Sequence, residues 1–157
     1  MSIKDRLMGD LKVALRSGDE TRKSTIRLAL DSLHKAEIPA EGETIASKGA
    51  LDEAAVLKVL VDEAKKRRDS IAEFERGGRP DLAARERAEL EVLLEYLPPQ
   101  LSQEEIARLA RETIRQVGAS GPAHMGQVMK ALMPQIQGRA DGKVVSQVVR
   151  QLLESGA

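Results

Sequence analysis

The chain has 157 residues, no cysteine, and 25 basic against 25 acidic side chains, so its formal net charge is zero. The length allows one or two small domains, and a chain near 150 residues buries roughly 70% of its unfolded surface, enough for a real core. A neutral chain has no global field that would draw it to nucleic acid or anionic lipid, and the lack of cysteine excludes disulfides, thiol catalysis and thiolate metal sites. Because Phe74 and Tyr96 are the only aromatic residues, the core must be aliphatic.

The N-terminus leads directly into an amphipathic pattern. No apolar signal core follows Met1, and no apolar run approaches the length of a membrane span. We therefore expect a soluble, cytoplasmic protein with no membrane partner.

Helical periodicity continues through the chain without a convincing alternating strand pattern, which predicts an all-α fold. Gly18 and Gly77-Gly78 are helix stop signals, and Asp19 and Asp52 are good N-caps. In the N-terminal part these signals predict four helices, over residues 3 to about 18, 19 to about 37, 52 to about 76, and 80 to 97. Residues 39–49 have the composition of a loop.

Pro98-Pro99 is the best domain boundary in the sequence, because it forbids a continuous helix. Ser102 and Glu105 then form a capping-box pattern that starts the next helix. Three helices are expected after the boundary, from Ser102 to Gly118, from Gly121-Pro122 to Pro134, and from Asp141 onward. The prediction is two helical lobes, a four-helix N-terminal domain of residues 1–98 and a three-helix C-terminal domain of residues 99–157.

The last two predicted helices each carry one apolar stripe. Met125, Val128, Met129 and Leu132 share a face, as do Val144, Val145, Val148, Val149 and Leu152. Lys130, Arg139 and Lys143 lie off these stripes and are left for solvent or a partner. The C-terminal residues 101–157 carry a net charge of +2, against −2 for residues 1–100.

This tail, Gly126-Gln-Val-Met-Lys130 with the turn around Arg139, resembles that of the GatB/YqeY family. The stretches from Arg68 to Leu82 and from Glu95 to Ser102 look like the mid-chain motif and the inter-domain joint of its stand-alone YqeY-like members. The tail is also similar to the end of the B subunit of tRNA-dependent amidotransferase, an appended helical module that meets the tRNA body. The resemblance implies a tRNA-associated or amidotransferase-associated role. The segment from Ala131 to Gln137 is longer and more apolar than in the amidotransferase.

Nothing in the sequence indicates an active site, a cofactor or a metal. His34 and His124 lie on different predicted helices without metal-ligand spacing; His34 is expected to be a partly buried packing residue, and His124 an exposed one. Glu86 and Glu89 are expected in surface ion pairs worth a few tenths of a kcal/mol. The family label of carbon–nitrogen ligase activity with glutamine as amido-N-donor is therefore not expected of this chain alone.

Three basic clusters remain. Lys65 to Arg68 cannot all share one helical face and are flanked by carboxylates, so a salt-bridged surface is expected. Arg22, Lys23 and Arg27 form a slightly purer patch. In the tail, Lys143 lies in the first turn of a helix, where the dipole disfavours a cation. This position is a weak indication of a phosphate or carboxylate partner, and the default interpretation is an internal pair between Arg139 or Lys143 and a nearby carboxylate such as Asp141.

We therefore predict a non-catalytic accessory module that binds folded RNA, tRNA above all. The predicted contacts are Gln127, Lys130, Arg139, Lys143 and Arg150. The scarcity of aromatic residues counts against the stacking used by single-strand readers, so contacts with the RNA backbone are expected. The alternative is a helical protein–protein adaptor without RNA contact, whose partner belongs to the aminoacylation or amidotransferase machinery.

Overall fold

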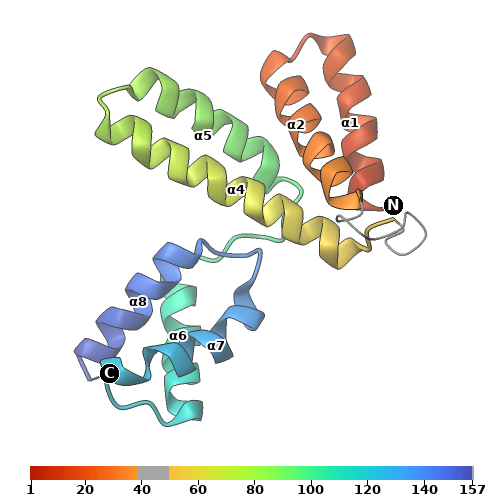
Figure 1. The fold of residues 1–157 in the computed structure, drawn as a ribbon. Helices are drawn as coiled ribbons and strands as arrows, with labels where there is room; N and C mark the ends of the chain where they lie inside the picture. The colour runs from red at the N-terminus through yellow and green to blue at the C-terminus, as the bar shows by residue number, and fades with distance from the viewer. Residues whose placement is uncertain (39–49, 157) are drawn as a thin grey trace. The chain divides into compact units, whose positions relative to one another are not determined.

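The computed structural model describes residues 1–38 and 50–156, and every regular element in these ranges is helical (Figure 1). The loop expected over residues 39–49 lies outside the described part. In chain order the elements are α1 (Ile3–Ser17), α2 (Glu20–Glu37), α4 (Glu53–Arg76), α5 (Pro80–Leu94), α6 (Gln103–Val117), the 3-10 turn η1 (Pro122–His124), α7 (Met125–Ile136) and α8 (Gly142–Glu154). The predicted all-α fold is confirmed.

Local signals account for most of the helix ends. The carboxylates of Asp19 and Asp52 cap α2 and α4 by accepting backbone N–H groups three residues on. Ser102 caps α6 in a complete capping box with Glu105. Gly118 ends α6 with φ 69°, a left-handed conformation that glycine adopts without a steric penalty.

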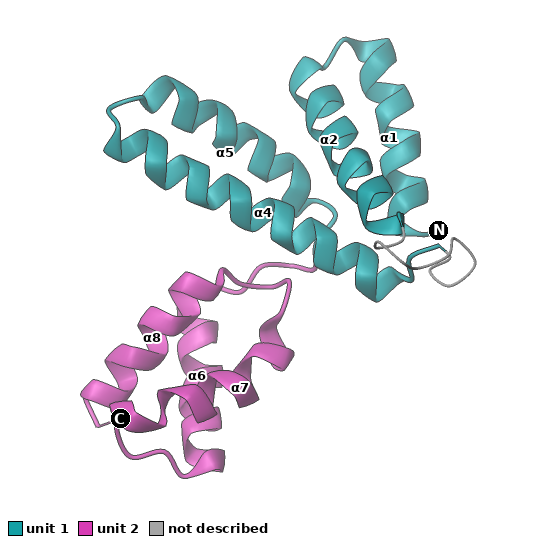
Figure 2. Cartoon of the chain, viewed as in Figure 1, with its two compact units in different colours: residues 1–97 teal, residues 98–157 magenta. Residues whose placement is uncertain are grey.

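The contacts divide the chain into two compact units, residues 1–97 and residues 98–157 (Figure 2). Unit 1 consists of the α1–α2 hairpin and the α4–α5 hairpin, and α2 packs against both α4 and α5. Apart from Tyr96, its core is aliphatic, as the composition requires. The largest side chains in it with no exposed surface are Leu7, Ile26, Leu33 and Leu60.

Unit 2 is a three-helix bundle in which α6, α7 and α8 each pack against the other two. Val128, Leu132, Ile136, Val145 and Val149 are fully buried in its core. These residues come from the apolar stripes of the sequence, or one turn beyond them in the case of Ile136. The periodicity therefore correctly identified the inward faces of α7 and α8.

Pro134 does not end the helix that contains it, which corrects the prediction. Helix α7 runs on to Ile136, although proline supplies no N–H to the carbonyl four residues earlier. Ile136 is fully buried, and burying such a side chain contributes about 1.5–3 kcal/mol. That gain is comparable to the cost of roughly 3 kcal/mol for a proline inside a helix. At its other end, α7 begins at Met125, after the η1 turn, rather than at Gly121-Pro122.

Two further expectations were wrong. Helix α5 ends at Leu94 instead of Leu97, and Tyr96 and Leu97 follow in a turn, both buried in the core of unit 1. His34 is exposed on 74% of its side chain, because it lies off the buried stripe of α2.

Among the described residues, no helix is both long and apolar enough to cross a membrane.

Candidate functional site

Gln127 and Lys130 lie on the solvent side of α7. Val128, Leu132 and Ile136 fill the core of unit 2, and at about 100° per residue Lys130 points away from that stripe. Both Gln127 and Lys130 are exposed. The outward orientation is as the pattern predicts, whereas contact with RNA remains a prediction.

Lys143 and Arg150 occupy the outward face of α8. Val145 and Val149 are buried on the opposite face, and Lys143 and Arg150 are exposed, with Gln147 between them on the same side. The helix begins at Asp141, whose Oδ1 accepts the N–H of Lys143 over 3.1 Å. The carboxylate at this N-terminus reduces the unfavourable effect of the helix dipole on the nearby cation.

Arg139 lies in the turn between α7 and α8, which backbone hydrogen bonds hold firmly. Its N–H donates to the carbonyl of Ile136 over 2.9 Å, and its own carbonyl accepts the N–H of Leu101 over 2.7 Å. The side-chain amide of Gln100 donates to the carbonyl of Gly138 over 2.8 Å. The turn that carries Arg139 is thus fixed to the segment before α6, an arrangement that no sequence signal indicated.

The half-buried Arg139 also lies within electrostatic reach of Glu105. Hydrogen bonds from Ser102 lower the pKa of the Glu105 carboxyl, burial raises it, and the charges of Arg108 and Arg139 lower it further. The first turn of α6 and the α7–α8 turn therefore lie at the same end of the bundle. Arg139, one of the predicted contact residues, therefore also takes part in the structure of the bundle.

Most carboxylates of unit 2 are engaged in local structure. Glu105 completes a capping box, Asp141 caps α8, and Glu112 pairs with Arg115. Within the described ranges, five cations of the unit form no ion pair: Arg108, Arg111, Lys130, Arg139 and Arg150. Unit 2 therefore presents basic side chains that form no ion pair in its described part, although Arg108 and Arg139 lie within electrostatic reach of Glu105.

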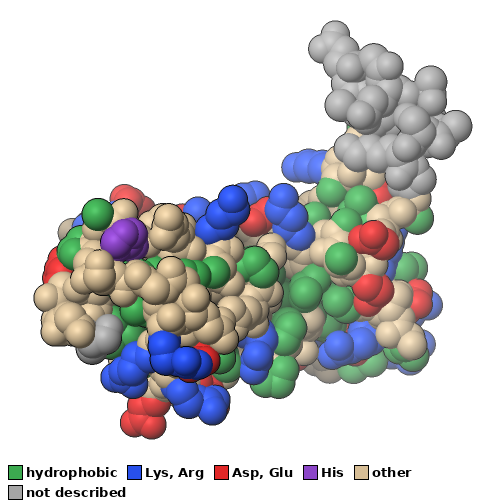
Figure 3. All heavy atoms as spheres, turned by 90° about the horizontal axis from the view of Figure 1, so that it is seen from below, with side chains coloured by type: hydrophobic (Ala, Val, Ile, Leu, Met, Phe, Trp, Pro, Cys, Tyr) green, Lys and Arg blue, Asp and Glu red, His purple; other side chains and the backbone are tan. Residues whose placement is uncertain are grey.

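Unit 1 differs in degree, because about half of its described Lys and Arg side chains form ion pairs. The patch expected at Arg22, Lys23 and Arg27 is largely neutralised: the Arg22 guanidinium binds both oxygens of Glu95 at 2.6 and 2.9 Å, and Lys23 pairs with Glu20 at 2.7 Å. Lys66 and Arg67 also bind carboxylates, as expected for a salt-bridged surface. Figure 3 shows basic side chains interspersed with acidic and apolar ones on the face drawn.

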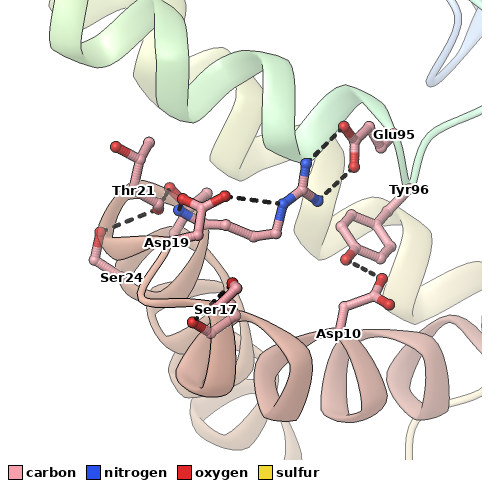
Figure 4. Close-up of polar contacts among 10 residues, drawn as sticks. Asp10, Ser17, Asp19, Thr21, Ser24, Glu95 and Tyr96 are labelled. Carbon is pink, nitrogen blue, oxygen red and sulfur yellow. Dashed lines mark hydrogen bonds and ion pairs between the residues drawn. The ribbon is translucent and has the colours of Figure 1, made fainter.

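Glu95 and Tyr96 tie the end of α5 to the α1–α2 hairpin (Figure 4). The Tyr96 hydroxyl donates to Asp10 Oδ2 over 2.5 Å, and the Arg6 guanidinium lies 5.1 Å from the ring centroid. Burial, and then the bond to Asp10, raise the pKa of Tyr96, while the hydrogen bonds from Arg22 lower that of Glu95. The sequence indicated an inter-domain joint near Tyr96, but it did not indicate that Asp10 and Arg6 contact this tyrosine. The only available signal was a single tyrosine next to an acidic residue.

A second charged cluster joins α4 to α5. Arg67 Nε lies 3.3 Å from Glu89 and Arg67 Nη1 lies 3.7 Å from Glu86, with 13%, 15% and 19% of the Arg67, Glu89 and Glu86 side chains exposed. Burial and the neighbouring Glu89 raise the pKa of Glu86, and Arg67 opposes them. The expectation that Glu86 and Glu89 form surface pairs with residues three or four positions away was therefore wrong, because both are half-buried and pair with Arg67 on α4.

Metal ligands, the second histidine and a surface groove can be compared with the expectations from the sequence. They contain no group of three or more His, Cys, Asp or Glu side chains able to hold a metal. His124 Nδ1 accepts the N–H of Ser120 over 3.2 Å in a half-buried position, more enclosed than expected. A groove of about 360 Å³ between α2 and α5 is lined by Glu20 and Glu89 among others, and both carboxylates are held by neighbouring cations.

Comparison with known proteins gives a consistent family assignment. The family model described as Yqey-like protein matches residues 4–153. "Altered inheritance of mitochondria protein 41, mitochondrial" from Pyrenophora tritici-repentis is 31% identical over 94% of this chain and 79% of its own length. The proteins of the same name from Lachancea thermotolerans and Candida glabrata are 34% and 33% identical, each over 74% of this chain. The matches span only 60% and 62% of those two relatives. The chain belongs to the family of YqeY-like proteins.

Proposed function

We propose that the chain is a non-catalytic accessory module that binds folded RNA, tRNA above all, through unit 2. The observation that carries the proposal is the set of cations without ion pairs in the described part of this unit, most of whose carboxylates serve in caps and in the Glu112–Arg115 pair. RNA phosphates would supply the missing counter-charge. The resemblance of the tail to that of the amidotransferase B subunit points to the same class of partner.

Contacts with the RNA backbone suit this unit better than base reading. Unit 2 contains no Phe, Tyr or Trp, so it lacks the side chains on which unpaired bases most often stack. Its long, exposed Lys130 and Arg150 side chains can instead reach phosphate oxygens. Affinity should then depend steeply on salt and little on sequence.

A salt titration with two matched variants tests the proposal. In Lys130→Glu/Arg150→Glu, both changed residues are exposed and lie opposite the core. Arg139 is left intact because of its proximity to Glu105 and its position in the fixed turn. The control, Lys58→Glu/Lys65→Glu, makes the same charge change on exposed positions of α4 in unit 1.

The slope of log affinity against log salt is the quantity to measure, with a tRNA transcript as ligand. If both residues contact phosphates, the slope should fall by about two units in the unit 2 variant, because each lost contact removes about one. The control should retain nearly the parent slope. A parent protein without measurable affinity at low salt would refute the proposal, and a loss of the same size in both variants would show non-specific charge attraction.

The absence of catalysis is part of the same proposal. It rests on the lack of cysteine and of a nucleophile constellation in the sequence. Purified protein should neither hydrolyse glutamine nor amidate Glu-tRNA or Asp-tRNA. Turnover that copurifies with the chain and disappears with a point mutation would contradict this.

A second candidate function, that of a protein–protein adaptor, is favoured by α1. Met8 and Leu15 are 48% and 49% exposed, and residues seven apart lie on the same side of a helix. If the adaptor function is correct, Met8→Glu/Leu15→Glu should abolish copurification with a protein of the aminoacylation or amidotransferase machinery and leave RNA binding unchanged. Persistent copurification would exclude this face.

We propose a cytoplasmic location. The names of the fungal relatives place those proteins in mitochondria, so the two compartments should be compared directly. Cell fractionation with an antibody to the chain would decide between them.

A further inference from the structure

Exposed apolar side chains gather on and beside the α1–α2 hairpin of unit 1 (Figure 1). Met8 and Leu15 lie seven residues apart on one side of α1, and they are 48% and 49% exposed. Single exposed apolar residues are normal on a protein, whereas a cluster of them marks an interaction surface. The large exposed apolar residues in the described part of the chain, all but the last of them within residues 1–38, are Met1, Met8, Val13, Leu15, Leu28, Ile38 and Val117.

A row of residues on α2 lies beside the row of Met8 on α1. Lys4 lies one turn before Met8, and its Nζ binds Glu37 Oε1 of α2 at 2.7 Å, so the two rows face the same side of the hairpin. Leu30 shares the row of Glu37, seven residues earlier. Leu11 and Leu30 are half-buried and pack against the core of unit 1. We call this surface the hairpin face, made of Met8, Leu11, Lys12 and Leu15 of α1 with Lys23, Arg27 and Leu30 of α2.

Two cations of the hairpin face have no ion pair among the described residues. At the end opposite Glu37, the carboxylate is engaged, because Glu20 Oε2 binds Lys23 Nζ at 2.7 Å. Lys12 and Arg27 are exposed and appear in no ion pair with a described residue. Asp31, one turn after Arg27, points directly away from the core of α2 and does not pair with it. The face therefore combines apolar side chains with uncompensated positive charge.

This combination fits an acidic amphipathic helix. From Met8 to Leu15 the helix rises about 10 Å, or two turns, which matches the apolar residues at positions i, i+3, i+4 and i+7 of a second helix lying on it. Carboxylates beside that apolar row would meet Lys12 and Arg27, and such complementary charges favour one partner over others. An anionic membrane suits the face less well, because interfacial helices bury a long, continuous apolar side.

We propose that the hairpin face binds an acidic amphipathic helix of a partner protein. The apolar side of that helix packs on Met8 and Leu15, and its carboxylates lie beside Lys12 and Arg27. This inference rests on the adaptor function, the second candidate above, and adds the chemistry of the partner. It involves neither RNA nor unit 2.

The probe is a display library of helical peptides about 20 residues long, since shorter isolated helices are marginal in water. Each peptide has a fixed apolar row and randomised residues on both sides of it, and the full chain serves as the target. Selected peptides are then titrated in solution with the parent, Met8→Glu/Leu15→Glu, Lys12→Glu/Arg27→Glu and the control Lys58→Glu/Lys65→Glu. Circular dichroism and thermal unfolding establish which variants are folded, and the variant at Lys12 and Arg27 keeps the test decisive if the other does not fold.

The selected peptides should carry more Asp and Glu than Lys and Arg beside the apolar row. Met8→Glu/Leu15→Glu should abolish their binding. Lys12→Glu/Arg27→Glu should weaken it by about tenfold, because two attractions become repulsions, whereas the control should change it little.

Three results would overturn this inference. The first is a selection that yields no peptide dependent on Met8 and Leu15, and the second is a set of binders with neutral or basic flanks. The third is parent binding to phosphatidylglycerol vesicles, lost in Met8→Glu/Leu15→Glu, without any peptide binding. If the copurification described above is lost in that variant while the flanks are not acidic, the adaptor function stands and this inference alone fails. Persistent copurification would exclude the face and overturn both.

Discussion

Removing the Tyr96 hydroxyl tests whether the link between α5 and the α1–α2 hairpin stabilises unit 1. The side chain is 3% exposed, and its hydroxyl donates to Asp10 Oδ2. A hydrogen bond to a charged group contributes about 1.5–3 kcal/mol. Since Asp10 is only half-buried and can regain water, we expect Tyr96→Phe to cost about 1.5 kcal/mol at pH 7, near the lower limit of that range.

The dependence on pH gives the prediction a second, independent readout. Burial and Asp10 raise the pKa of Tyr96 above the ordinary 10.0. A raised pKa in the folded state means that the stabilisation is fully present below pH 10 and is lost as the pH rises through the folded-state value. The difference between parent and Tyr96→Phe should therefore be constant below about pH 9 and shrink above pH 10.

Both quantities can be measured in the full chain. Urea unfolding followed by circular dichroism gives the free energy difference, and because Tyr96 is the only tyrosine, absorbance near 295 nm reports its ionisation alone. As a control, Asp10→Asn should lower the pKa of Tyr96 only in part, because burial is the larger cause of the shift. Ionisation near pH 10 in the folded parent, or an unchanged midpoint in Tyr96→Phe, would refute the reasoning.

Three further predictions concern stability. Glu86→Gln should stabilise unit 1 at pH 7, because the raised pKa of Glu86 in the folded state means that its ionisation costs stability as the pH rises through that pKa. The gain in melting temperature should vanish near pH 4, where Glu86 is protonated in both states, and it should be absent in the exposed control Glu91→Gln. Leu132→Ala should cost about 2–5 kcal/mol in the urea transition of unit 2, because the side chain is fully buried, and a cost below 1 kcal/mol would contradict this packing. Ser102→Ala should cost about 1 kcal/mol by losing the capping box of α6, whereas Ser102→Asp should retain most of the stability.

The sequence predicted the helices well where the signal was local. Asp52 and Ser102 cap the expected helices because a cap depends on residues only three positions apart. Pro134 was misjudged because the burial of Ile136, a tertiary effect, compensates for the lost hydrogen bond. The burial of His34 was predicted wrongly because it follows the buried Leu33 in the sequence. Consecutive residues of a helix differ by about 100° in direction, so His34 points towards solvent.

The candidate surface was predicted only in part. Lys130 and Arg150 could be assigned to outward faces because periodicity separates polar from apolar sides. Arg108 and Arg111 of α6 were missed, because a basic pattern in the sequence does not show which cations find carboxylate partners. Arg22 illustrates the converse, since its partner Glu95 is 73 residues away.

The sequence by itself determined the all-helical class, most of the helix ends and the inward faces, because these follow from backbone capping and from the 3.6-residue period. Only the tertiary structure decided which charges are neutralised and which are buried. It pairs Arg22 with Glu95, half-buries Glu86 and Glu89 beside Arg67, and leaves Arg108, Arg111 and Lys130 without ion pairs to any residue that the structure describes. Ion pairs depend on distances of a few ångströms between side chains from different helices, and packing, rather than the order of residues, sets those distances.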